Sequence, residues 1–171
     1  MKRIMVMSVS PGAGKSTLAR QLGDILGIEA YHLDRYFWKP GWVQATEEEF
    51  EEKQREMVSE ESWIIDGNYS GTYKIRTSRA DTIIYIELPL LTCLLRVFKR
   101  WWRHRGQIRE DIGCTERMEF DFLKFIVTTY YRRKKRMRER FRAIQQEDVT
   151  KEIILLRSRR DVQAFLEDQK G

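Results

Sequence analysis

A glycine-rich turn between an apolar segment and an amphipathic segment constrains this chain more than any other feature. The turn reads Ser-Pro-Gly-Ala-Gly-Lys-Ser-Thr over residues 10–17. It follows the apolar run Arg3–Ser8, which is typical of a buried strand, and it opens the segment Lys15–Leu26, whose apolar residues recur at helical spacing. A glycine-rich turn in this strand-to-helix position is typical of a phosphate-binding loop.

The residue types in this loop suit a nucleoside triphosphate. Gly12 and Gly14 allow backbone conformations that point successive N–H groups at an anion, and the start of the helix adds a partial positive charge. We predict that Lys15 is catalytic and contacts the β- and γ-phosphates of ATP, and that the Ser16 hydroxyl is a ligand of Mg²⁺. The predicted cofactor-binding residues are Pro11, Gly12, Ala13, Gly14, Lys15, Ser16 and Thr17.

One position departs from the usual pattern G-x-x-x-x-G-K-[ST]. The first glycine of that pattern is Val9 in this chain. Because Val9 ends a strand, where an extended conformation is acceptable for valine, we expect a variant loop that still binds phosphate.

The rest of the chain alternates apolar runs with helical patterns, which predicts an α/β fold. Thr46 and Glu49 form a capping box that opens a helix to about Glu61. Further predicted strands lie at 29–33, 62–66, 81–87 and 151–156, and a short last helix follows from about Arg160 to Gln169. We therefore predict one domain over residues 1–171, a three-layer sandwich with a five-stranded parallel sheet.

About 60 residues separate the last two predicted strands, which is more than a minimal crossover needs. This insertion carries a predicted helix from about Leu90 and a long amphipathic helix whose apolar positions run from Phe120 to Ile144. We expect a lid and a long basic helix over about residues 96–147. Arginines that close on a transferred phosphoryl group lower the barrier to its transfer, and Arg100 and Arg105 are the catalytic candidates in the lid.

Composition limits the class of protein further. The chain has 171 residues, a formal net charge of +6 and two cysteines without metal-ligand or CxxC spacing, so a disulfide framework and a structural zinc site are excluded. The apolar run at residues 4–9 is too short for a signal peptide, and none is long enough to span a membrane. We expect a cytoplasmic protein, either a monomer or a homodimer.

Several short motifs occur in an order that resembles a known family. They are His-Leu-Asp at 32–34, Trp-Lys-Pro-Gly-Trp at 38–42, Asp-Gly-Asn-Tyr at 66–69 and Arg-Ala-Asp-Thr at 79–82. Together with the phosphate loop, this set resembles the bacterial FlaR-like DNA topology modulation proteins of the adenylate-kinase-like group of P-loop NTPases. The resemblance covers nearly the whole chain and implies a nucleoside- or shikimate-kinase-like fold with a helical lid.

The wider kinase group also implies roles for two aspartates. Asp34 matches the carboxylate that activates the acceptor hydroxyl or holds the metal through water, and Asp66 matches the aspartate that assists Mg²⁺. We assign Asp34 as catalytic base and Asp66 as metal support, against the alternative that each only caps the following turn. The group's phosphate-gripping arginine is missing from the stretch after Asp66, and Arg76 or Arg79 are candidates to replace it. The aromatic cluster at 36–42 either lines an acceptor pocket or covers the sheet edge.

Two functions remain open from the sequence. The first is ATP-dependent phosphotransfer to a small-molecule acceptor. The second is an ATP-binding regulator that engages DNA through the basic run at residues 132–142, which carries eight Lys and Arg residues. A solvated or core-docked helix is the alternative interpretation of that run, and we favour it because no helix-turn-helix or base-reading motif is visible.

Overall fold

The computed structural model describes residues 1–104 and 120–171. Its centre is a parallel sheet of five strands in the order β2-β5-β1-β6-β7. The strands are β1 (Arg3–Ser8), β2 (Ala30–His32), β5 (Trp63–Asp66), β6 (Thr82–Ile86) and β7 (Glu152–Leu156). A small antiparallel hairpin of β3 (Trp38–Lys39) and β4 (Val43–Gln44) stands apart from this sheet.

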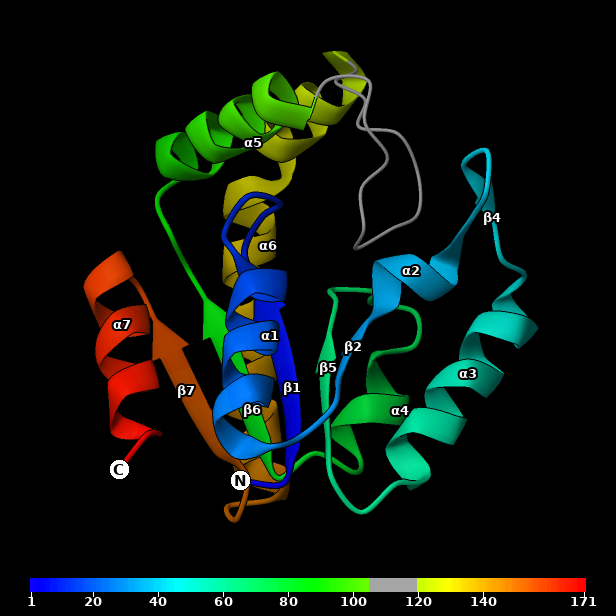
Figure 1. The fold of residues 1–171 in the computed structure, drawn as a ribbon, viewed down its shortest axis with the longest axis vertical. Helices are drawn as coiled ribbons and strands as arrows, with labels where there is room; N and C mark the ends of the chain where they lie inside the picture. The colour runs from blue at the N-terminus through cyan, green and yellow to red at the C-terminus, as the bar shows by residue number, and fades with distance from the viewer. Residues whose placement is uncertain (105–119) are drawn as a thin grey trace.

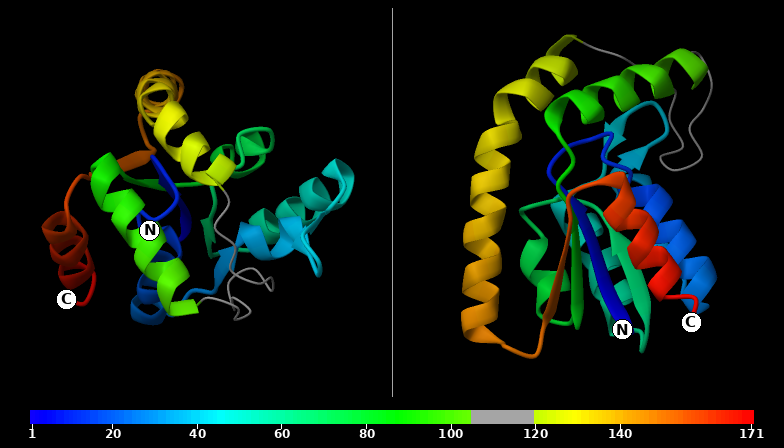
Figure 2. Two further views of the ribbon diagram at one scale, coloured as in Figure 1. Left: turned by 90° about the horizontal axis from the view of Figure 1, so that it is seen from above. Right: turned by 90° about the vertical axis from the view of Figure 1, so that its left-hand side faces the viewer.

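Helices cover both faces of the sheet and one end of it (Figures 1 and 2). One face carries α1 and α7, and the other carries α4 and α6, with α3 beside α4. Helix α5 crosses above the carboxyl ends of the strands, where the ligands of parallel α/β proteins bind. The bounds are α1 (Lys15–Leu26), α2 (Leu33–Phe37), α3 (Glu47–Ser59), α4 (Tyr73–Thr77), α5 (Leu90–His104), α6 (Phe120–Glu147) and α7 (Arg159–Asp168).

The core has two halves because successive strand side chains point to opposite faces. On β1, Ile4 and Val6 pack toward α1 and α7, whereas Met5 and Met7 pack toward α3, α4 and α6. All four side chains are buried. Burial on both faces explains why the strands read as continuous apolar runs and not as alternating ones.

The predicted fold class is confirmed, and the five predicted strands form the sheet with ends that differ by at most one residue. The capping box of Thr46 and Glu49 is present, with both reciprocal hydrogen bonds formed at the start of α3. The five-residue helices α2 and α4 and the β3-β4 hairpin were not predicted, because such short elements leave no periodic pattern. Within residues 1–104 and 120–171, no helix is both long and apolar enough to cross a membrane.

Candidate functional site

The phosphate loop has the backbone geometry that its glycines suggest. Gly12 and Gly14 have φ angles of 81° and 98°, in the region that disfavours any side chain, and Gly14 is the N-cap of α1. Val9, directly after β1, is fully buried, and its N–H donates to the Ile86 carbonyl at 2.9 Å. This explains why valine serves where the usual pattern has glycine. Lys15 and Ser16 are the first residues of α1 and are half-buried beside the loop.

Helix α5 lies directly against this loop. A Cβ on Gly12 would come within 2.4 Å of the Cys93 carbonyl oxygen and 2.9 Å of Val97 Cγ2. Arg96 Nη1 donates to the Ala13 carbonyl at 3.1 Å. The basic stretch of the predicted lid therefore meets the loop through Arg96, which the sequence places on the same side of this helix as Arg100 but which was not chosen as a catalytic candidate.

The two arginines chosen as lid residues have different outcomes. Arg100 lies one turn after Arg96 on α5 and is half-buried, and its contact with a phosphoryl group stays a prediction. Arg105 lies outside the described residues.

Asp66 forms a close pair with a histidine on the neighbouring strand. Asp66 ends β5 and is 4% exposed, and its Oδ2 lies 2.6 Å from Nδ1 of His32, the last residue of β2. The parallel register places these two residues side by side. Sequence reasoning left His32 without a site role. The sequence indicates that both residues lie at strand ends, but it does not show that β2 and β5 are neighbours in the sheet.

Asp34 is held by a phenol. It lies in the first turn of α2, and its Oδ1 accepts a hydrogen bond of 2.6 Å from the Tyr69 hydroxyl. Burial and the neighbouring Asp34 carboxylate raise the pKa of Tyr69, so the phenol stays protonated and keeps donating. Tyr69 was quoted only as part of a family motif, and its contact with Asp34 spans 35 positions of the chain.

The two arginines considered as replacements for the missing phosphate-gripping arginine are used elsewhere. Arg76 is completely buried, and it donates to Gln54 Oε1 at 2.8 Å and to the Tyr69 carbonyl at 3.0 Å. Burial lowers the pKa of Arg76 to about 10. Arg79 Nε donates to the Val58 carbonyl at 3.4 Å. Neither residue is among those that line the cavity described next. Because Arg76 donates to the Tyr69 carbonyl, it holds the backbone turn that carries Tyr69.

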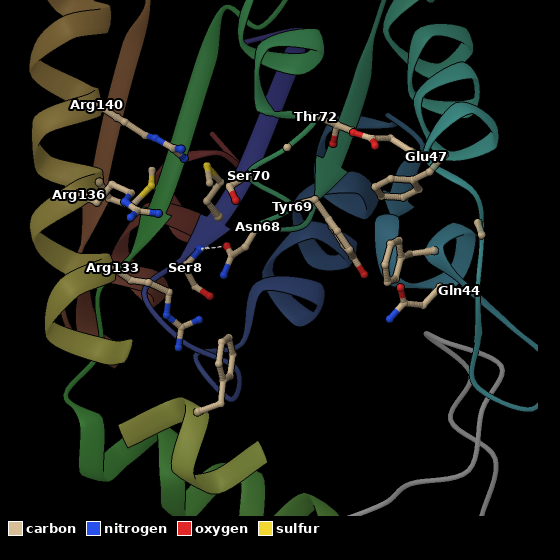
Figure 3. A pocket seen from close by; sticks show the side chains of 17 residues that line it. Ser8, Gln44, Glu47, Asn68, Tyr69, Ser70, Thr72, Arg133, Arg136 and Arg140 are labelled. Carbon is tan, nitrogen blue, oxygen red and sulfur yellow. Dashed lines mark hydrogen bonds between the residues drawn. The ribbon is translucent and has the colours of Figure 1, made fainter. Parts of the chain in front are cut away.

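A cavity of about 600 Å³ opens where β1 ends, between α6 on one side and the β4–α3 segment on the other (Figure 3). Tyr69 lines it, whereas Asp34, which accepts from the Tyr69 hydroxyl, is not a lining residue. Of the aromatic cluster at 36–42, Phe37 lines the cavity, while Trp38 and Trp42 pack edge to face on the hairpin. The polar lining residues are Ser8, Gln44, Glu47, Asn68, Tyr69, Ser70, Thr72, Arg133, Arg136 and Arg140, and the others are Met7, Phe37, Ala45, Phe50, Gly71, Phe125 and Met137.

The basic run of α6 does not form one surface. The helix docks on the core through buried residues that include Tyr130, Met137 and Phe141, which confirms the core-docked interpretation. Lys134 and Arg138 contact the buried carboxylate of Glu87 at 3.0 and 2.9 Å. Three other arginines of the run, at positions 133, 136 and 140, face the cavity.

Oxygen donors suited to Mg²⁺ lie at the strand ends and the loop. The Ser16 hydroxyl and the Asp66 carboxylate are of the type that Mg²⁺ prefers. Among the residues that the structure describes, no group of three or more His, Cys, Asp or Glu side chains is placed to hold a metal.

The sheet order, the loop and the covering helix give the chain a fold that it shares with solved P-loop kinases. The solved structures most similar in fold include shikimate kinase from Bacteroides thetaiotaomicron, with a TM-score of 0.56 and 16% identity over 98% of this chain and 95% of that one. Shikimate kinase from Acinetobacter baumannii in complex with shikimate has a TM-score of 0.55 and 14% identity, covering 98% and 90%. An unliganded sugar kinase from Janibacter has a TM-score of 0.54 and 16% identity, covering 99% and 90%.

At these identities the likeness shows a shared fold. No protein-family model matches the chain, and no curated protein matches it. The resemblance to topology modulation proteins therefore has no support from these comparisons.

Proposed function

We propose that the protein is a phosphotransferase that moves the γ-phosphate of ATP to a small-molecule acceptor. The observation that supports this proposal is that the phosphate loop and the cavity meet at one strand end. The phosphate loop starts at the carboxyl end of β1, and Ser8, the last residue of that strand, lines the cavity of about 600 Å³. A bound triphosphate and an acceptor in the cavity would thus approach each other at one strand end, as in-line transfer requires.

The roles follow from the positions. Lys15 and the loop amides would hold the β- and γ-phosphates, and Arg96, whose guanidinium already lies against the loop, would add positive charge there. Mg²⁺, held through Ser16 and supported by Asp66, would neutralise charge on the transferred group. We keep Arg100 and Arg105 as further lid residues of this proposal.

Asp34 remains our proposed catalytic base. Tyr69 lines the cavity and its hydroxyl donates to Asp34, so on this proposal a proton from the acceptor would reach the carboxylate through the phenol. His32 would position Asp66 by its 2.6 Å contact. We further propose that the chain acts in the cytoplasm, where Mg·ATP is available.

The test is Mg·ATP consumption with a panel of acceptors: nucleosides, nucleoside monophosphates, hydroxy acids and sugars. We expect one acceptor class to raise turnover about a hundredfold and the Lys15→Ala variant to lose that gain, because the lysine acts on the transferred charge. Lys170→Ala is the matched control, since Lys170 pairs with Glu167 near the C-terminus. Tyr69→Phe reports on the proposed proton route.

Duplex DNA forms a separate arm of the panel. It represents the regulator suggested by the family resemblance. A slow rate of ATP hydrolysis that no small molecule changes, but that DNA changes, would contradict the phosphotransferase and favour that regulator.

A further inference from the structure

One side of α6 presents a row of arginines to the cavity. Arg133, Arg136 and Arg140 are spaced by three and four residues, so they share a helix face and extend over about 10 Å. Figure 3 shows the three side chains reaching from α6 into the cavity, with Ser70 and Asn68 in front of them and Glu47 on the far side. The charged groups of the cavity are thus separated into a basic wall and an acidic edge.

Within residues 1–104 and 120–171, the arginines of this row have no carboxylate partner, unlike Lys134 and Arg138 beside them. Lys134 and Arg138 contact Glu87. Arg133 instead stacks on Phe125 with 4.7 Å between guanidinium carbon and ring centre, and Arg140 stacks on Tyr73 at 4.8 Å. An aromatic ring holds the flat face of a guanidinium and leaves its N–H edge available to an oxyanion.

The buried edge of Arg133 has no partner in the described parts of the chain. Its Nε and Nη2 atoms are buried there without a hydrogen bond. Burial lowers the pKa of Arg133, which reflects the cost of a cation removed from water without a counter-charge. An anion in the cavity would accept hydrogen bonds from these donors and offset the desolvation of the cation.

Neutral hydrogen-bonding groups also line the cavity. The Thr72 hydroxyl is buried without a partner among the described residues. Asn68 accepts from the Ser8 N–H through Oδ1 at 3.0 Å, which leaves its amide nitrogen as a donor. Met7, Phe50 and Met137 are apolar residues of the same lining.

We propose that Arg133, Arg136 and Arg140 form a subsite for an oxyanion carried by the acceptor, a phosphate or a carboxylate. The inference rests on the proposed function for its link to catalysis. It assigns the acceptor an anionic end at α6, an apolar middle, and the reacting hydroxyl at the end nearer Ser8 and the phosphate loop.

The test measures direct binding of inorganic phosphate and of acetate by calorimetry, without any turnover. The Lys15→Ala protein is the background, because the phosphate loop would otherwise bind phosphate as well. In this background we compare Arg133→Gln, Arg136→Gln and Arg140→Gln with two matched controls, Arg132→Gln and Arg142→Gln. The control side chains lie on the same helix, carry the same charge and do not line the cavity.

We expect each cavity variant to weaken anion binding about tenfold and each control to leave it unchanged, as loss of one charge-assisted hydrogen bond predicts. Tighter binding of phosphate than of acetate would assign a phosphate-bearing acceptor, and the reverse order a carboxylate-bearing one. Equal losses in both sets, or no anion binding in the Lys15→Ala background, would overturn the subsite. Circular dichroism of each variant excludes unfolding as the cause.

This design separates the two proposals. Anion binding that depends on the arginine row, in a protein without acceptor-stimulated turnover, supports the subsite and contradicts the phosphotransferase. Turnover that survives in all three cavity variants with an unchanged KM supports the phosphotransferase and contradicts the subsite.

Discussion

At Gly12 the backbone of the phosphate loop meets the backbone of α5 with no room for a side chain. The residue also has a φ of +81°. Two separate penalties therefore act on any replacement: the strain of a left-handed conformation and a collision with the Cys93 carbonyl. Gly41 has nearly the same φ, +82°, and open space around it, so it isolates the first penalty.

We predict that Gly12→Ala lowers the free energy of unfolding by about 2–4 kcal/mol and weakens ATP binding, since the loop or α5 must shift. Gly41→Ala should lower the free energy of unfolding by about 1–2 kcal/mol through strain alone. Urea unfolding and ATP titration of both variants measure the difference. Equal stability of the two variants would show that α5 does not press on the loop.

At the residue scale, the loop was predictable and its surroundings were not. Local spacing sufficed for residues 10–17, because the loop's function depends on neighbours in the chain. Arg96, His32 and Tyr69 act through partners 83, 34 and 35 positions away. No periodic pattern records such contacts, so these three residues needed the fold before their roles could be seen.

Among the elements, β6 and α6 are joined by two ion pairs that share one buried carboxylate. Glu87, directly after β6, is buried, and its Oε1 contacts Lys134 and Arg138 of α6. Burial alone would raise the pKa of Glu87, but hydrogen bonds from Arg138 and Lys134 lower it below its ordinary value of 4.5. A carboxyl group with a depressed pKa stabilises the fold above its unfolded-state pKa, and that stabilisation is lost as the pH falls through the folded-state value.

We predict that Glu87→Gln lowers the free energy of unfolding by about 1–3 kcal/mol at pH 7, because Lys134 loses its counter-charge at a part-buried position. The gap from the wild type should shrink as the pH falls from the ordinary pKa of 4.5, where the unfolded chain takes up a proton, through the lower pKa of the folded-state carboxyl. Denaturant titrations from pH 3 to pH 7, with steps of about one unit, follow this gap. Glu51→Gln is the control: its pair with Arg55 is exposed and should change stability little. A gap that does not depend on pH would contradict the assignment.

The elements with strong periodic or capping signals were predictable from the sequence. α1 and β1 have the predicted bounds, and α3 starts after the predicted cap at Thr46. The division of α6 among the core, Glu87 and the cavity was not predictable. Its basic residues look alike in the sequence, and only the packing of the helix decides which ones meet a carboxylate, a ring or water.

For the whole molecule, the proposed ligand should be visible as stability. A ligand that binds only the native state raises the unfolding free energy, by about 2.7 kcal/mol at a concentration of 100 times its Kd. For a chain of 171 residues this corresponds to a rise in Tm of roughly 5–11 °C. We predict such a rise with Mg·ATP for the wild type and for Lys170→Ala, and a much smaller one for Lys15→Ala. Differential scanning calorimetry measures it, and identical shifts in all three proteins would show that ATP does not bind at the loop.

The architecture was predictable because alternating strands and helices leave few parallel topologies. The position of α5 over the loop and the cavity beside α6 were not, since the insertion that carries both helices has no counterpart in the strand pattern. The fold thus follows from local signals, whereas the acceptor side of the site depends on how one insertion packs.

Different residues of α6 pack on the core, pair with Glu87 or line the cavity, and this limits how the helix can change over evolutionary time. Each residue added to a helix rotates everything after it by about 100°. A single insertion early in α6 would turn Arg136 and Arg140 away from the cavity and bring Met137 and Phe141 out of the core. Substitutions in this helix should therefore be tolerated far more often than changes in its length. Related sequences should differ there in residue type but should have the same number of residues.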